Sequence, residues 1–253
     1  MTDRITLVPE QLPGAVPDDA MRSYTPLYPD VVRAGSLRNA LQDVADRAGY
    51  GLDVELTTSP GWRYVAAKVA AGGRSANALM ALDVRSFAVG CWAGTVHMAD
   101  GSTDDLSEVA GALHAWLRRA RVGELVDQWP FMRTWALAEA HERGRAIPAR
   151  WTQLRTSVAG TRNTELRALV EAAFGRPELR ALSPGRSMYW LTFSRQAAPP
   201  LCRDLPAVMP LGNGRYRVRH TDGRTLEAEG ADEAVVAVLA WLPADVAAAP
   251  ETM

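Results

Sequence analysis

The dipeptide Asp222-Gly223 stands between two segments in which apolar and polar residues alternate, and this arrangement predicts a β-hairpin. Its strands are expected at residues 215–220 and 224–229. A helix with a continuous apolar face is predicted directly afterwards, at residues 231–242, and Pro243 ends it. A hairpin followed at once by an amphipathic helix buries one face of an antiparallel sheet against that helix, which favours an α+β fold.

The N-terminal half repeats this order of elements. A helix capped by Ser36 is predicted first, and Gly49 ends it. Strands are then expected at residues 52–56, 62–71, 78–84 and 86–93, and a segment at 96–99 can continue the last of them. Asp100-Gly101 ends this series of strands. Thr103 or Ser102 is expected to cap the helix that follows, through residue 117.

The middle of the chain is predicted to be helical, in segments at residues 122–129, 131–143, 148–158 and 166–174. A strand at residues 186–195 follows, with both of its faces covered. The predicted fold is therefore α+β, with two antiparallel sheet regions, packed helices and a helical middle.

The two predicted helices that follow strands end in similar short motifs, Leu-His-Ala-Trp-Leu within 104–117 and Leu-Ala-Trp-Leu within 232–242. Two interpretations stay open. The chain is a pseudo-duplicate of one β-then-α unit, or it holds two ordinary amphipathic helices that share a Trp-Leu pair.

Five regions are predicted along the chain. They are a Pro-rich N-terminal arm at 1–29, an N-terminal α+β unit at 30–121, a helical connector at 122–178, a C-terminal β-meander plus helix at 179–243, and a tail at 244–253.

Composition limits the class of protein. A net charge of -1 and a pI near 6.4 give no overall field for nucleic acid or an anionic membrane. No segment approaches the ~18 apolar residues of a membrane helix, and we expect no membrane partner. The N-terminus has no run of signal-peptide length, and the two cysteines form no disulfide framework, so a cytoplasmic location is expected.

Basic residues are unusual in kind, because Lys68 is the single lysine among 28 Lys and Arg residues. Codon usage in a high-GC genome explains this pattern, and so does selection of Arg for bidentate contact with carboxylates or phosphates. Composition does not separate the two explanations.

Two residue pairs are candidates for catalysis. His141 and Glu142 adjoin near the end of a predicted helix, where His can exchange protons near neutral pH. A His at a helix C-terminus is also favoured by the helix dipole alone. Cys91 and His97 lie on successive strand segments, which a hairpin can bring together as nucleophile and base. A small core residue is the alternative role for Cys91.

Arginine and tryptophan supply the candidates for ligand binding. Arg215, Arg217 and Arg219 recur at every second residue, so their side chains share one face of a strand. They can hold a carboxylate-rich peptide or a phosphate, or they can pair with Glu227 and Glu229 on a solvated hairpin. Arg186, Trp190 and Arg195 complete the candidate set. No cofactor and no metal site are predicted, since the four histidines are far apart in sequence.

Several short sequence motifs resemble those of a family of actinobacterial natural-product biosynthesis proteins, the domain of unknown function 6193. The motifs in the C-terminal part are Leu179–Pro184, Leu191–Arg195, Gly214–Val218, Ala231–Val235 and Trp241–Pro243. The motifs before it are Tyr28–Val31, Ala34–Leu37, Trp129–Phe131 and Ala140–Gly144 with Trp151. The resemblance spans residues 27–243. Residues 183–188 depart from the family's usual Phe-Pro-Phe-Thr-Ser-His. The resemblance supplies no catalytic residues.

The resemblance implies an accessory protein of natural-product biosynthesis that acts on or binds a pathway intermediate, small molecule or peptide. The alternative is a non-catalytic binding module that serves as a carrier, in partner recognition or in self-protection. The oligomeric state is left open.

Overall fold

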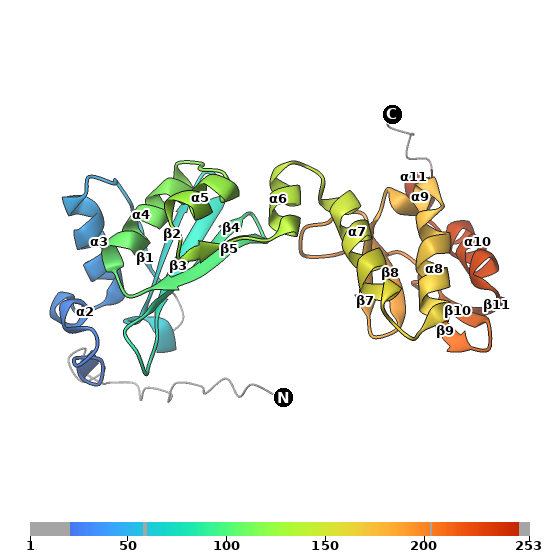
Figure 1. Ribbon diagram of the computed structural model, residues 1–253, viewed down its shortest axis with the longest axis horizontal. Coiled ribbons are helices and arrows are strands. Elements are labelled where there is room, and N and C mark those ends of the chain that lie inside the picture. The colour runs from blue at the N-terminus through green and yellow to red at the C-terminus, as the bar shows by residue number, and fades with distance from the viewer. Residues whose placement is uncertain (1–20, 58–59, 203, 248–253) are drawn as a thin grey trace. The chain divides into compact units, whose positions relative to one another are not determined.

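The computed structural model describes residues 21–57, 60–202 and 204–247 (Figure 1). The chain forms two compact units, Met1–Glu139 and Ala140–Met253. Each contains one antiparallel sheet with packed helices, which confirms the predicted α+β class.

In the first unit the sheet has the order β1-β2-β3-β4-β5-β6, so every strand pairs with its neighbour in sequence. Its elements are α2 (Pro29–Ala34), α3 (Leu37–Arg47), β1 (Val54–Leu56), a 3₁₀ turn (Pro60–Trp62), β2 (Ala66–Ala71), β3 (Arg74–Met80), β4 (Phe87–Ala93), β5 (Val96–Thr103), α4 (Leu106–Leu117), α5 (Val122–Gln128), β6 (Met132–Arg133) and α6 (Ala136–Glu142). The expectation that a strand begins at Trp62 is wrong, because that residue ends the 3₁₀ turn.

Two helices of the first unit begin at side-chain caps. The Ser36 hydroxyl accepts a hydrogen bond from the Asn39 amide at 3.1 Å, as predicted for the start of α3. Helix α4 is capped by Asp105, whose carboxylate accepts from the Ser107 amide at 2.7 Å. The predicted cap at Thr103 or Ser102 is wrong, since β5 extends to Thr103 and includes Asp100-Gly101.

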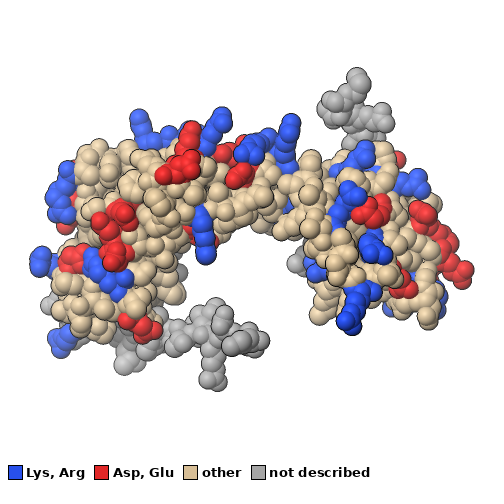
Figure 2. Space-filling model, in the orientation of Figure 1, with Lys and Arg blue, Asp and Glu red and all other residues tan. Residues whose placement is uncertain are grey.

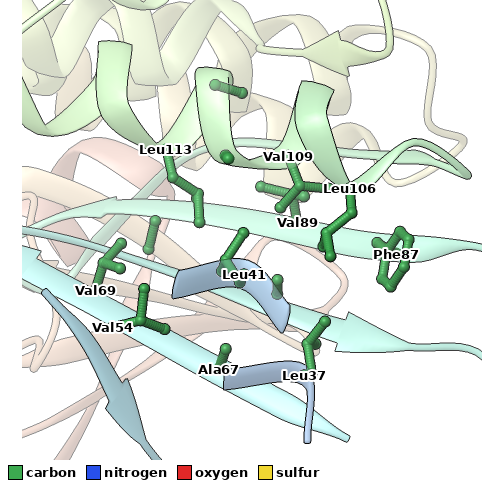
Figure 3. Close-up of a cluster of buried hydrophobic side chains, with 14 of the residues drawn as sticks. Leu37, Leu41, Val54, Ala67, Val69, Phe87, Val89, Leu106, Val109 and Leu113 are labelled. Atoms are coloured by element: carbon green, nitrogen blue, oxygen red, sulfur yellow. The ribbon is translucent and has the colours of Figure 1, made fainter. Parts of the chain in front are cut away.

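The core of the first unit lies between one face of the sheet and helices α3 and α4. Figure 3 shows side chains of both helices gathered over the strands. Leu41 and Leu113 from the helices are fully buried with Val69 and Phe87 from the sheet. Burial of each such side chain contributes about 1.5–3 kcal/mol to folding.

Polar contacts join α4 to the sheet at the helix C-terminus. The indole of the buried Trp116 donates to the Ser75 carbonyl at 3.1 Å. The Arg74 guanidinium lies over the Trp116 ring and donates to the carbonyls of Trp116 and Ala120 at 2.9 and 2.7 Å. The arginine thus adds a donor at the C-terminal end of α4 and ties the segment that follows the helix to the sheet.

The predicted helix at 131–143 is wrong in its first part, where β6 instead pairs with the edge of the sheet. Gly101 of β5 faces Met132 of β6. A Cβ at residue 101 would lie 2.3 Å from the Phe131 carbonyl oxygen, so glycine permits this approach of two backbones.

The predicted N-terminal arm lies outside the described residues up to position 20. From Met21 onward it packs against the first unit, and Tyr28 is fully buried. The Tyr28 hydroxyl lies 2.8–2.9 Å from the carbonyl oxygens of Ala81, Val84 and Ser86 and accepts from the Ser86 amide at 2.9 Å. This hydroxyl is thus the centre of the loop that joins β3 to β4.

The second unit also holds a sheet of sequential neighbours, in the order β11-β10-β9-β8-β7. Its elements are α7 (Ala146–Ala159), α8 (Thr164–Phe174), α9 (Pro177–Arg180), β7 (Ser183–Ser187), β8 (Trp190–Ser194), β9 (Ala207–Gly212), β10 (Arg215–Arg219), β11 (Thr225–Glu229), α10 (Ala231–Ala240) and α11 (Ala244–Ala247). Helix α11 lies within the predicted tail. Helices α7, α8 and α10 pack on the sheet, with Trp151, Leu169 and Val238 in the core.

The strand predicted at 186–195 is two strands. β7 and β8 form a hairpin in which Ser187 faces Trp190, and Met188 turns the chain with φ of 55°. The expectation that both faces are covered is wrong at this turn, where Met188 and Tyr189 are exposed. The Asp222-Gly223 hairpin is confirmed, with Arg217 opposite Glu227 and Arg215 opposite Glu229.

The two units share an order of elements: helices come first, a meander of adjacent strands follows, and a helix comes after it, although β6 joins the first sheet only after α4 and α5. In each, the helix after the meander contacts a helix before it, α4 with α3 and α10 with α8. The shared Trp-Leu motifs differ in role, because Trp116 is buried inside α4 whereas Trp241 caps the end of α10. The common architecture favours the pseudo-duplicate interpretation, while the tryptophans themselves do not correspond.

Candidate functional site

The face of the first sheet opposite the core carries a continuous row of residues across all six strands. Strand pairing aligns Glu55, Lys68, Asn77, Gly90, Asp100 and Arg133 in that order. Their neighbours in the same strands, such as Val69 and Ala78, point into the core instead. Asn77 and Arg133 are exposed, and the side chains of Lys68 and Glu55 are about half exposed. We call this surface the open face.

Trp92 lies on the open face near the end of β4. It stands two residues after Gly90 on β4, and therefore on the same side of the sheet. A Cβ on Gly90 would lie 2.4 Å from Cη2 of the Trp92 ring and 3.1 Å from the Asn77 Oδ1 atom. The missing side chain at Gly90 thus provides the space in which the indole lies back over its own strand.

His97 and Trp135 complete an aromatic cluster with Trp92. His97 faces Trp92 across the β4–β5 pair, and the two rings are stacked with centroids 4.9 Å apart. The Trp135 ring also packs against His97, with the two ring centroids 4.9 Å apart and the ring planes tilted by 55°. All three side chains are partly exposed, so they present a joined aromatic surface to solvent. We call these three residues the aromatic cluster.

Charged and polar groups adjoin the aromatic cluster. Arg133 forms a salt bridge with Asp100, and the Thr134 hydroxyl donates to the Met98 carbonyl at 2.9 Å. Both contacts hold the segment that carries Trp135 beside β5. A bulge between Cys91 and Trp92 in the β4–β5 pairing sets which residues face each other at this point.

The structure does not bring Cys91 and His97 together as nucleophile and base. Cys91 points into the core opposite Ala99 and is fully buried. Burial raises the pKa of its thiol to about 12, although Arg74 acts in the opposite direction. A buried thiol with a raised pKa matches the core role.

His141 lies near the end of α6, and Glu142 is the last residue of that helix. Burial and the positive charge of Arg150 lower the pKa of His141. Arg150 donates from Nη2 to the Ala197 carbonyl at 2.9 Å, and burial lowers its own pKa as well. Burial and a neighbouring positive charge therefore both disfavour the imidazolium form of His141.

The predicted ligand-binding arginines fall into two groups. Arg195 forms salt bridges with Asp204 and Asp245, and Arg215 and Arg217 both pair with Glu227. The cross-strand contact to Glu227 matches the solvated-hairpin alternative. Arg219 lies over the Trp190 ring, 4.2 Å from its centroid, and Arg186 is exposed on β7.

Charges are mixed on the side of each unit that Figure 2 shows, with Arg and Lys interspersed among Asp and Glu. Within the described ranges, no three His, Cys, Asp or Glu side chains gather in a way that could hold a metal ion. None of the described helices has the length and apolar character that crossing a bilayer requires.

Sequence reasoning missed the aromatic cluster as a unit, although it identified His97 and noted the tryptophans. The available signal was Gly90 two residues before Trp92, since a glycine inside a strand often marks a close approach by another group. Trp135 could not be placed from sequence, because its position depends on β6.

Comparison with known proteins identifies similarity in the second unit. No curated protein and no solved structure matches the chain. The N-terminal motifs from Tyr28 to Gly144 lie outside the match that was found, and for them the resemblance stays a prediction. Residues 145–252 match the model of a family of unknown function, DUF6193.

Proposed function

We propose that the protein is a binding module for a planar small molecule or an aromatic peptide side chain, and that its ligand is an intermediate of natural-product biosynthesis in the cytoplasm. The observation that carries the binding role is the partly exposed aromatic cluster on the open face. The biosynthetic setting rests on the resemblance of the sequence to its family.

Three properties of the open face support a planar ligand. Tryptophan and histidine rings offer flat surfaces on which conjugated groups stack. Trp92 lies outside the hydrophobic core, so core packing does not account for its position. The charges of Lys68, Asp100 and Arg133 are mixed in sign, which suits a ligand with several polar substituents more than one with a single large charge.

The test is native mass spectrometry of the full-length protein purified from its producing host. We expect the wild-type protein to retain a mass that Trp92→Ala and His97→Ala lose. Trp62→Ala is the matched control, because Trp62 is 40% exposed and lies outside the aromatic cluster. A retained mass that Trp92→Ala leaves in place would refute the assignment to the open face.

The second candidate function is enzymatic, with His141 and Glu142 as the residues to replace first. Its support is the lowered pKa of His141, because burial and the charge of Arg150 favour the neutral imidazole that a general base uses. Loss of product formation on replacing His141 and Glu142, with binding retained, would favour catalysis. Unchanged product formation removes both residues from the mechanism.

A further inference from the structure

The hairpin β7–β8 ends in a turn whose two residues are large, apolar and in solvent. Met188 is 85% exposed and Tyr189 is 60% exposed. Met188 also has a left-handed backbone, with φ of 55°, which glycine or asparagine adopts at lower cost. Side chains that are both exposed and poorly suited to their backbone are not explained by the folding of the hairpin.

Arginine lies on both sides of this turn. Arg186 is paired with Leu191, and the two side chains lie on one face of the hairpin. Ser187 and Trp190 are paired on the opposite face. The Arg219 guanidinium stacks on that Trp190 ring, 4.2 Å from its centroid. Arg186, Met188, Tyr189, Trp190 and Arg219 together are named the hairpin tip.

The two arginines of the hairpin tip differ in their pairing from Arg195, Arg215 and Arg217, which all form salt bridges. Within the part of the chain that the structure describes, neither Arg186 nor Arg219 forms a salt bridge, and Thr225 is the residue that faces Arg219 on β11. Arg215 and Arg217 on the same strand share Glu227. A guanidinium that stacks through its flat face keeps its N–H groups, which lie in the plane, free to bind a carboxylate.

We infer that the hairpin tip docks an acidic peptide segment of a partner protein that also carries a large apolar residue. The segment crosses the turn, so that its carboxylates bind Arg186 on one face of the hairpin and Arg219 on the other, and its apolar residue packs on Met188 and Tyr189 between them. Arginine, tyrosine, tryptophan and methionine are the residue types enriched at protein interfaces. The binding of planar ligands by the first unit is a separate proposal, and either can fail without the other.

The probe is a short synthetic peptide of Glu, Asp and Phe, titrated into the full-length protein by isothermal calorimetry. Its control is the peptide of the same length with Gln and Asn in place of the acids. We expect the acidic peptide to bind, the amide peptide to bind at least about tenfold more weakly, and the affinity to fall with added salt.

Variants of the protein locate the site. Arg219→Gln, Arg186→Gln and Tyr189→Ser should each weaken binding about tenfold. The matched controls are Arg167→Gln, which removes an exposed charge from α8, and Val236→Ser, which removes a side chain of α10 that is 51% exposed. Both should bind as the wild type does.

Three results would overturn the inference. They are no binding of the acidic peptide, equal binding of the amide peptide, and equal loss of binding in the control variants. Association of the hairpin tip with phosphatidylglycerol vesicles in place of the peptide would assign it to a membrane surface and would also refute the peptide site.

Discussion

Replacing Gly101 with alanine tests whether close backbone approach at β5 holds β6 in the sheet. The new Cβ would lie 2.3 Å from the Phe131 carbonyl oxygen and 2.9 Å from the Met132 Cα. Both contacts are with backbone atoms, so a rotamer change cannot relieve them. Either β5 and β6 stay paired under strain, or β6 separates from the sheet.

Each of the two responses has a cost that the structure limits. Overpacking costs about 1–3 kcal/mol when the surroundings adapt, and backbone adapts least. Separation of β6 exposes Met132, which is 2% exposed, at about 1.5–3 kcal/mol. It also breaks the Thr134–Met98 hydrogen bond, at about 1 kcal/mol. The Arg133–Asp100 salt bridge is exposed to solvent and adds little to this cost. Because the less costly response sets the loss, we expect Gly101→Ala to lower the unfolding free energy of the first unit by about 1–3 kcal/mol.

Gly123→Ala is the matched control, because a Cβ there meets no atom within 4 Å. Residue 123 lies in helix α5, so alanine should stabilise it by up to about 1 kcal/mol. Hydrogen exchange of the full-length protein, read on peptides of the first unit, reports that unit separately from the second. Protection of the segment at 129–135 should fall most. Native protection of that segment in Gly101→Ala, with a change in unfolding free energy below about 0.5 kcal/mol, would refute the reasoning.

Three further predictions concern groups that differ in burial. Tyr28→Phe removes the hydroxyl that binds the β3–β4 loop, so the unfolding free energy measured by urea denaturation should fall by about 1–3 kcal/mol. A smaller loss would show that water replaces the hydroxyl in these hydrogen bonds. Because the pKa of His141 is lower in the folded state, the unfolded chain binds more protons below about pH 6.5, and the unfolding free energy should fall as the pH drops through that value. His141→Gln should reduce this dependence of the unfolding free energy on pH. An unchanged dependence would exclude His141 as its source. A thiol reagent at neutral pH should modify the partly exposed Cys202 and spare Cys91 until the protein unfolds, as mass spectrometry can establish, and rapid labelling of Cys91 would contradict its burial.

The common order of elements in the two units bears on how such a chain arises. Each unit is a meander of neighbouring strands with a helix before and after it. Short connections between adjacent strands follow directly from strong turn signals, so this order is accessible to many sequences. Superposition of experimental structures of the two units would distinguish duplication from independent adoption of the same arrangement.

Local signals in the sequence determined much of the fold. Three predictions that depend on residues close in the chain are confirmed. They are the Asp222-Gly223 turn, the Ser36 cap and the apolar periodicity of α4 and α10. Such features depend on local backbone preferences and on the periodic spacing of apolar residues, and both can be seen directly in the sequence.

Only the tertiary structure decided the candidate site. β6 has two residues and no periodicity of its own, and it exists because Gly101 leaves room at a sheet edge. Trp135 reaches His97 through that pairing, and the bulge beside Cys91 sets the face on which His97 meets Trp92. Contacts between residues far apart in the chain depend on the register of strands and on space left by missing side chains, and neither quantity is encoded in a local pattern.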